Sequence, residues 1–334
     1  GSSIKPLATF TPAIERNLIT WSTMILDSAF PYQGKKQWPK NVDNTYGSGV
    51  KVTVQKALEK SLNTVAARIN VDYVTPSKSY DFVKNNFHIS TLDPKRDPFA
   101  APMAVGALTN GVTTLEMAAA YATFGNGGKY YKPYSYFKVT NIDGTEVLLE
   151  NNPVGEQVMA VDTSEVMCKM LQTVDTSNLG AGPNVRRFPI MCKTGTTDNE
   201  HDRWFCGGTP HFVAAVWYGY DLPRPINEFP NPAGKIFISV FDRISKGMPD
   251  KDFPQSGLAV QRRYCLSSGL IAGENCASTA VGWYRIGNIP ATCTQCSAPT
   301  PTLPGVDDLI DNIIDSVTGL FTRPETTVKN PTDD

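Results

Sequence analysis

Long hydrophobic runs are missing from this chain of 334 residues. The longest apolar stretch runs from about Phe212 to Tyr220. A helix that crosses a bilayer needs roughly 18 or more apolar residues, so no segment is predicted to span a membrane. No signal-peptide pattern opens the sequence either, and any membrane anchor of a parent protein is expected to lie upstream.

Excess charge of one sign is also missing, because 31 basic residues face 32 acidic ones. The balance argues against the basic surface that nucleic acids need. Histidine is scarce: the three residues are His88, His201 and His211. Their spacing is typical neither of a metal site nor of a Ser-His-Asp triad. The hydrophobic content of 41% suffices for one large domain or two small ones.

Cysteine, by contrast, is abundant, with seven residues. Four of them fall late in the chain: Cys265, Cys276, Cys293 and Cys296. They predict disulfides in an exported domain, and three pairings are open. The alternative is zinc on the CxxC of Cys293 and Cys296, but the other two lack a paired spacing, so no metal and no cofactor are predicted. The remaining three are expected to be small buried residues: Cys168, Cys192 and Cys206.

Apolar periodicity and capping signals predict the helices. Their expected ranges are 2–28, 53–66, 115–124, 162–174 and 234–247. Thr53 is an expected N-cap, and Thr113 with Glu116 forms a capping box, so Glu116 is interpreted as a capping carboxylate and not as a catalytic base.

Strand signals and turn residues complete the expected fold. A hairpin is predicted over 130–149, and strands over 189–196 and 204–220, whereas 29–52 is expected to be loop. After Cys296 we expect a Pro/Thr linker, a short amphipathic helix over 306–321 and a disordered tail. The prediction is an α+β fold, with helices around an antiparallel sheet, in one domain over 1–297 followed by the segment 298–334.

Three short motifs occur in a fixed order: Ser2-Ser-Ile-Lys5, Ser61-Leu-Asn63 and Lys193-Thr-Gly195. Each is weak alone, but the ordered set is shared by serine acyl-transferases of the penicillin-binding and β-lactamase type. The competing match Ser48-Gly-Val-Lys51 lies in a Gly-rich loop only a short distance before Ser61, and we reject it as the nucleophile.

The spacing of these motifs has a chemical reason. Residues i and i+3 of a helix share a face, so Lys5 can reach the hydroxyl of Ser2 and act as its base. A nearby cation such as Lys193 would lower the pKa of Lys5. Ser61 and Asn63 offer a proton shuttle and an orienting amide. Gly195 leaves room for an extended peptide beside an edge strand.

At the level of longer motifs the chain resembles the transpeptidase domain of class A, bifunctional penicillin-binding proteins. Gly1-Ser-Ser-Ile-Lys-Pro6 resembles their GSxxKP motif. The further matches cover about residues 1–276: Trp38–Asn41, Val52–Asn63, Asn110–Gly128, Lys193–Thr197, Asp202–Phe205, Val216–Asp221 and Ser268–Cys276. Met191-Cys192 stands where the family usually has Ala-Gly.

The resemblance implies a penicillin-binding protein/serine β-lactamase-like fold with an all-helical lobe. It implies transpeptidation of D-Ala-D-Ala stem peptides of peptidoglycan through a Ser2 acyl-enzyme, inhibition by β-lactams, and a location outside the bacterial cell membrane. Backbone N–H groups of Ser2 and Thr196 would form the oxyanion hole. The substrate is expected to be held by four residues of one strand and its end: Thr194, Gly195, Thr196 and Thr197, together with Lys193.

The resemblance also implies parts that precede the serine in this family, namely an anchor, a glycosyltransferase domain and the first strands of the sheet. We therefore expect the chain to be N-terminally truncated, with reduced activity. Two alternatives stay open: a serine β-lactamase, which would need an efficient deacylating base, and a non-catalytic β-lactam-binding sensor. The lifetime of the acyl-enzyme would distinguish the first alternative from a transpeptidase.

Overall fold

The computed structural model describes residues 1–180 and 182–296. Its first segment is helical and buried: η1 (Ser2–Ile4), η2 (Pro6–Phe10) and α1 (Thr11–Glu15) follow one another without a break. The predicted helix over 2–28 is therefore too long. It ends because Asn17 adopts a left-handed backbone, with φ of 57°. The hydroxyl of Thr23 then accepts a bond from the Thr20 amide, which turns the chain toward the first strand.

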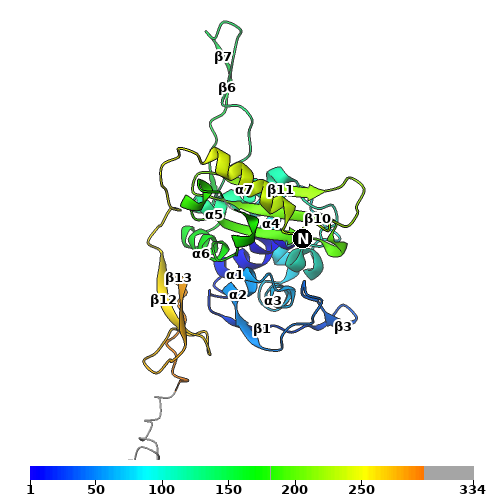
Figure 1. The fold of residues 1–334 in the computed structure, drawn as a ribbon, viewed down its shortest axis with the longest axis vertical. Coiled ribbons are helices and arrows are strands. Elements are labelled where there is room, and N and C mark those ends of the chain that lie inside the picture. The colour runs from blue at the N-terminus through cyan, green and yellow to red at the C-terminus, as the bar shows by residue number, and fades with distance from the viewer. Residues whose placement is uncertain (181, 297–334) are drawn as a thin grey trace, which may run out of the picture.

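A helical lobe surrounds this segment (Figure 1). Its elements are α2 (Val54–Glu59), α3 (Asn63–Arg68), η3 (Ile69–Val74), α4 (Pro76–Asn86) and η4 (Ala101–Val105). Thr53 caps α2, as predicted, because its hydroxyl accepts a bond from the Lys56 amide. The single helix expected over 53–66 is interrupted, since Ser61 has a left-handed φ of 57°. This break turns Ser61 and Asn63 inward.

The predicted loop over 29–52 contains short strands. These are β2 (Phe30–Tyr32), β3 (Lys35–Trp38) and β4 (Lys51–Thr53), and β4 pairs with β1 (Met24–Leu26). The turn residues of this region sit between the strands, as the left-handed Gln33 and Gly34 show. Composition predicted the turns correctly but missed the strands, which are only three or four residues long.

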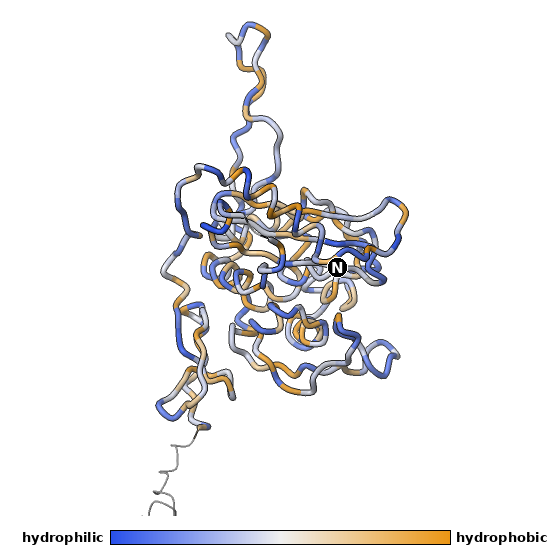
Figure 2. Tube along the Cα trace, viewed as in Figure 1, coloured by the Kyte–Doolittle hydropathy of each residue, from blue (hydrophilic) through white to orange (hydrophobic). Residues whose placement is uncertain are grey.

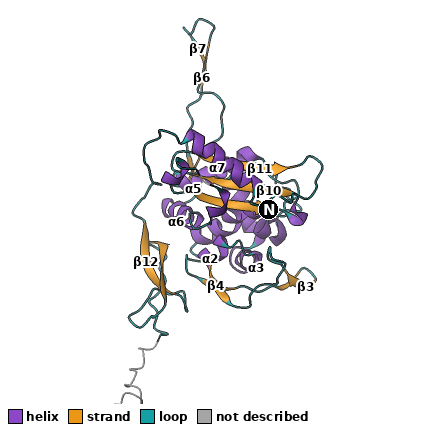
Figure 3. Cartoon of the chain, in the orientation of Figure 1, coloured by secondary structure: helices purple, strands orange, loops and turns teal. Residues whose placement is uncertain are grey.

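The main sheet is antiparallel and has the order β11-β10-β9. Its strands are β9 (Met191–Thr196), β10 (Asp202–Gly208) and β11 (Val213–Gly219). The expected strand over 204–220 is thus a hairpin, closed by the amide of Thr209 on the carbonyl of Phe212. Helices α5 (Thr114–Gly125) and α6 (Val161–Leu171) lie on one face, and α7 (Pro232–Ile244) lies on the other (Figure 3).

The alternation of side chains along the strands separates two hydrophobic cores. The larger core joins Met191, Trp204 and Cys206 to the helical lobe and α5. The smaller one joins Cys192 and Phe205 to α7. Hydrophobic stretches of the chain gather where the helices and the sheet meet (Figure 2). The predicted capping box of α5 is confirmed, and α6 ends at Leu171, three residues before the predicted end.

Two hairpins extend from the body (Figure 1). The first pairs β6 (Lys138–Thr140) with β7 (Val147–Glu150), which ends one residue beyond the predicted hairpin range, and the flanking β5 (Lys129–Tyr130) pairs with β8 (Glu156–Gln157). The second pairs β12 (Ala259–Cys265) with β13 (Thr279–Arg285) and was not predicted. Short 3₁₀ turns complete the list: η5 (Ser177–Leu179), η6 (Val185–Arg187) and η7 (Asp198–Glu200).

The four late cysteines do not pair two by two as disulfides, which corrects the prediction. Their sulfurs instead meet at one point beyond the end of the second hairpin, all within 4.8 Å of one another. Cys168, Cys192 and Cys206 are buried, as predicted. The amphipathic helix and tail predicted after residue 297 lie outside the described residues. Within 1–180 and 182–296, no helix combines the length and apolar character of a membrane span.

Candidate active site

The first residues of the chain are clamped between β9 and the end of η4. A Cβ at Gly195 would lie 3.0 Å from the Ser3 hydroxyl, which is tighter than an ordinary contact, so a glycine here favours the close approach of the strand. On the other side Gly106 has a φ of 82°, and a Cβ there would collide with the Gly1 carbonyl. The Gly1 nitrogen donates to the carbonyl of Gly106 at 2.8 Å. Ser2 is thereby fixed beside β9 and is only 8% exposed.

Lys5 lies behind Ser2 and is almost fully buried, with 1% exposure. Its Nζ donates to the Ser61 carbonyl at 2.7 Å, to the Ser61 hydroxyl at 3.3 Å and to Oδ1 of Asn63 at 2.5 Å. Burial, followed by the charge of Lys193, holds the pKa of Lys5 well below its ordinary value. A lowered pKa makes Lys5 a better group to accept a proton from a hydroxyl than an ordinary lysine.

Lys193 approaches the same point from β9. It is 1% exposed, and its Nζ donates to the carbonyl of Thr194 at 3.1 Å. Burial lowers the pKa of Lys193 to about 8, so the side chain still carries its charge at neutral pH. Among the residues described, neither Lys5 nor Lys193 forms an ion pair with a carboxylate. A buried cation at Lys193 without an anionic partner among these residues makes this region a favourable place for an anionic group of a ligand.

A cleft of about 820 Å³ opens in front of these side chains. Four predicted site residues line it: Ser2, Asn63, Thr196 and Thr197. Lys5, Ser61, Lys193 and Gly195 are not part of the cleft lining. The volume suits an extended peptide or a drug-sized molecule.

Thr194 is a predicted substrate-binding residue that is likewise absent from the cleft lining. Its register partner is Phe205, which packs on the α7 side of the sheet. At the end of the strand, Thr196 Oγ1 accepts a bond from Arg203 at 3.1 Å, which leaves its own O–H to donate to a ligand. Thr197 Oγ1 donates to Asp202 at 2.7 Å and braces the turn that follows.

A buried network that the sequence did not reveal holds the Ser61–Asn63 turn. The side-chain oxygen of Asn41 accepts the amide of Asn63 at 2.7 Å and that of Thr64 at 3.2 Å. Asn41 in turn donates to the carboxylate of Asp27 at 3.1 Å. Burial would raise the pKa of Asp27, but hydrogen bonds from Thr64, Ser48 and Asn41 outweigh it and lower the pKa. Asn41 belongs to a recognised family block, whereas Asp27 carried no signal at all.

The rejected candidates have structural explanations. Ser48 is exposed in a loop and Lys51 is exposed on β4, so they share no helix face. The Glu116 carboxylate accepts the Thr113 amide at 3.2 Å, as its capping role requires. Burial raises the pKa of Cys192 and Cys206 to about 12, which keeps both thiols near Lys193 neutral and unreactive.

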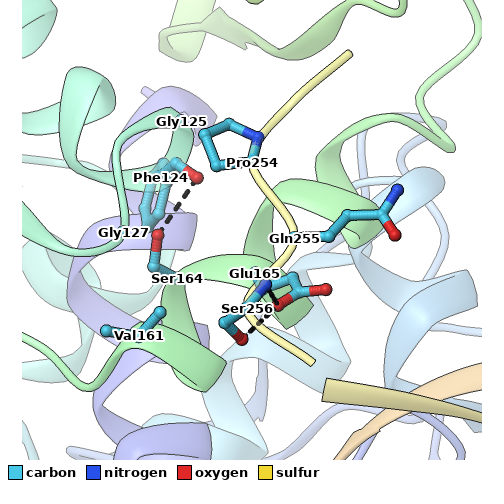
Figure 4. Close-up of a pocket in the computed structure, with 9 residues that line it drawn as sticks. All are labelled: Phe124, Gly125, Gly127, Val161, Ser164, Glu165, Pro254, Gln255 and Ser256. Carbon is cyan, nitrogen blue, oxygen red and sulfur yellow. Dashed lines mark hydrogen bonds between the residues drawn. The ribbon is translucent and has the colours of Figure 1, made fainter. Parts of the chain in front are cut away.

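A second, smaller pocket of about 120 Å³ lies away from this cleft, between α5, α6 and the segment before β12 (Figure 4). Two serines that line it already have hydrogen-bond partners. Ser164 donates to the carbonyl of Phe124 at 3.1 Å, and the hydroxyl of Ser256 donates to Glu165 at 2.6 Å. This pocket therefore serves to fasten the segment that leads to the second hairpin.

Comparison with known proteins decides the family. The model of the penicillin binding protein transpeptidase domain matches residues 1–220. The chain belongs to this family.

Penicillin-binding protein 4 of Bacillus subtilis is 35% identical over 227 residues, which cover 68% of this chain and 35% of that protein. Penicillin-binding protein 1A of Clostridium acetobutylicum is 32% identical over 266 residues, covering 77% of this chain and 32% of that protein. The chain thus spans about a third of the length of these relatives.

A solved structure agrees with the family at the level of the fold. The PonA1 protein of Mycobacterium tuberculosis in complex with penicillin V superposes with a TM-score of 0.63 and 23% identity, covering 76% of this chain and 71% of that one. The penicillin-binding fold predicted from the sequence is confirmed, and the relatives named penicillin-binding protein 1A confirm the class A resemblance.

Proposed function

We propose that this penicillin-binding domain is a serine D-alanyl-D-alanine transpeptidase that cross-links peptidoglycan stem peptides. The observation that carries the proposal is the convergence of Ser61 and Asn63 on Lys5, the lysine of the SxxK motif that begins with Ser2. Family membership supports the reaction class, a transpeptidase that transfers an acyl group. The serine mechanism and the role of each residue are inferred from the geometry and chemistry described above.

In the first half-reaction, Ser2 Oγ attacks the carbonyl between the two D-Ala residues, and its proton passes to the unprotonated Lys5 amine. The tetrahedral intermediate collapses when the C–N bond breaks. Ser61, 3.3 Å from Lys5 Nζ, then relays a proton to the departing amine of D-Ala. The products are an ester on Ser2 and free D-Ala. Asn63 keeps the Lys5 amine oriented.

In the second half-reaction, an amine of a neighbouring stem peptide attacks the Ser2 ester. The new amide forms, Ser2 leaves with a proton, and Lys5 returns to its first state. The backbone N–H groups of Ser2 and Thr196 would stabilise both oxyanions. Lys193, Thr196 and Thr197 would hold the carboxylate of the terminal D-Ala. A contribution of the Thr194 side chain is not part of this proposal, because Thr194 lies on the α7 side of the sheet, opposite to Lys193. β-Lactams would mimic D-Ala-D-Ala and acylate Ser2.

We further propose that residues 1–297 make up one transpeptidase domain and 298–334 a separate linker and tail. The parent protein would be a class A synthase with a glycosyltransferase domain and a membrane anchor, working on the extracytoplasmic face of a bacterial membrane. The names of the relatives and their greater length support this assignment.

Covalent labelling tests the proposal. The chain is incubated with benzylpenicillin, and intact mass followed by peptide mapping locates the adduct. We expect one long-lived adduct on the N-terminal peptide at Ser2. Ser2→Ala should abolish it, whereas the matched control Ser48→Ala, which alters the competing motif, should leave it unchanged. An adduct on Ser48 or Ser61 contradicts the assignment. Rapid release of the adduct would favour a β-lactamase, and labelling without D-Ala release from stem-peptide mimics would favour a sensor.

A further inference from the structure

The second hairpin ends in a cluster of four thiols that the transpeptidase reaction does not use. Cys265 ends β12, Cys276 lies in the connection to β13, and Cys293 and Cys296 follow β13. Their Sγ atoms all lie within 4.8 Å of one another. The chain therefore brings together sulfurs from three separate segments.

The backbone around the cluster is built to hold this arrangement. The amide of Cys293 donates to the carbonyl of Ile271 at 2.7 Å, and Ile271 also bridges to Tyr264 of β12. A Cβ at Gly273 would lie 2.5 Å from the Cys293 carbonyl, so glycine is needed where the loop before Cys276 passes this close. Cys265 and Cys293 are buried, and the other two are partly exposed.

The sulfur separations match a tetrahedral metal site. Cys296 lies 3.6 Å from Cys265 and 3.9 Å from Cys293. Zinc with four Zn–S bonds of about 2.3 Å places its sulfurs roughly 3.8 Å apart at the corners of a tetrahedron. Two disulfides would instead form two close pairs, with S–S near 2.05 Å and no need for the pairs to meet.

A hydroxyl group points at one of the sulfurs, as hydrogen-bond donors do around thiolate ligands. The Ser268 hydroxyl donates to Cys293 at 3.2 Å. Such donors stabilise the negative charge of metal-bound sulfur, whereas a disulfide carries no charge for them to stabilise.

We propose that Cys265, Cys276, Cys293 and Cys296 bind one Zn²⁺ ion as a four-cysteine site. On binding, the thiols give up their protons to solvent and each thiolate supplies one bond, so the coordination shell is complete. A shell without an open position makes the site structural and leaves zinc no part in the acyl transfer. The CxxC of Cys293 and Cys296 supplies two of the four ligands.

The location explains why the fold needs such a site. An isolated two-stranded hairpin is at best marginally stable in water. At its inner end this hairpin is held by Tyr284, which donates to Ser22 at 2.8 Å, and by Arg285, which pairs with Asp162 at 3.0 Å. The loop after Cys265 touches the body through Gly269, whose carbonyl accepts a bond from the Ser22 hydroxyl at 2.5 Å, and a metal there would join β12, the connection and the following segment.

The decisive experiment counts zinc and thiols in the same sample of the whole chain. The protein is purified without reductant, incubated with equimolar ZnCl₂ and desalted. Zinc per chain is then measured by elemental analysis, and thiols are alkylated in denaturant with a chelator. We expect one zinc per chain and alkylation of all seven cysteines. No zinc together with only three reactive thiols would mean two disulfides and overturn the proposal, as would seven thiols without zinc.

Variants locate the ion. Cys276→Ser should lose the zinc, and Cys276→His, which keeps a ligand at this position, should retain it even if the serine variant folds poorly. Cys168→Ser on α6 is the matched control outside the cluster and should keep one zinc per chain. Equal zinc content in Cys276→Ser and the unmodified chain would place the ion elsewhere and refute the assignment.

Discussion

Replacement of Lys193 by alanine tests the electrostatics of the site most directly. The ammonium is 1% exposed and has only the Thr194 carbonyl as a hydrogen-bond acceptor among the described residues. In the proposed complex it would gain a charge-assisted bond to the ligand carboxylate. Such a bond is worth about 1.5–3 kcal/mol, or roughly 10- to 100-fold in rate.

A second effect adds to the first. The charge of Lys193 helps to hold the pKa of Lys5 down. Without it the pKa of Lys5 rises toward its ordinary value, and a smaller fraction of Lys5 is unprotonated at neutral pH. We therefore expect Lys193→Ala to slow acylation by on the order of 100-fold or more. The pH at which acylation begins to rise should also move upward.

The assay is the second-order rate of acylation by a fluorescent penicillin across a range of pH. Lys35→Ala is the matched control, because Lys35 lines the same cleft but is exposed to solvent. It should change the rate by no more than about twofold, as is usual for a screened surface charge. If Lys193→Ala acylates as fast as the unmodified chain, the reasoning is refuted, and the Lys193-Thr-Gly195 motif has only a structural role in its strand.

Two more predictions concern protonation. Burial lowers the pKa of Lys193 to about 8, so this side chain loses its charge as pH rises through that value. The acylation rate of the unmodified chain should therefore fall above about pH 8, and a rate that stays constant to pH 10 would contradict this role of Lys193. Asp27→Asn should lower the free energy of unfolding at pH 7 by about 1–3 kcal/mol, since it removes a hydrogen-bonded buried charge. The pKa of Asp27 is lower in the folded state than in the unfolded state. Its contribution to the free energy of unfolding is therefore fully present above the pKa of an unfolded carboxyl group, and it is lost as the pH falls through the pKa of the folded state. Urea denaturation should therefore give free energies of unfolding that become equal in acid for Asp27→Asn and the unmodified chain. A difference that is the same at all pH values would contradict this prediction.

The sequence indicated most residues of the proposed site because their chemistry lies in short local motifs. Lys5 stands one helical turn after Ser2, and the KTG residues lie on one strand, so spacing alone indicated both. The break at Ser61 was missed because a left-handed serine carries no local signal, although this break is what turns Asn63 toward Lys5. Asp27 was missed for a related reason, since its partners are remote in the sequence.

The cysteines show the limit of spacing arguments most clearly. Only Cys293 and Cys296 are close in sequence, so composition favoured disulfides. Cys265 and Cys276 join them through the pairing of β12 with β13, a strand pair that the sequence analysis did not predict. Ligands brought together by tertiary pairing have no periodic pattern that a reading of the chain could find.

The proximity of Lys5 and Lys193 also links substrate binding to proton binding. A carboxylate placed beside Lys193 offsets its charge and raises its proton affinity, and the same effect weakens the repulsion that lowers the pKa of Lys5. By thermodynamic reciprocity, a ligand that increases proton affinity must itself bind more tightly when protons are available. Near pH 8 the domain should therefore take up a fraction of a proton as it binds an anionic ligand, while a neutral ligand of the same shape should bind without proton uptake.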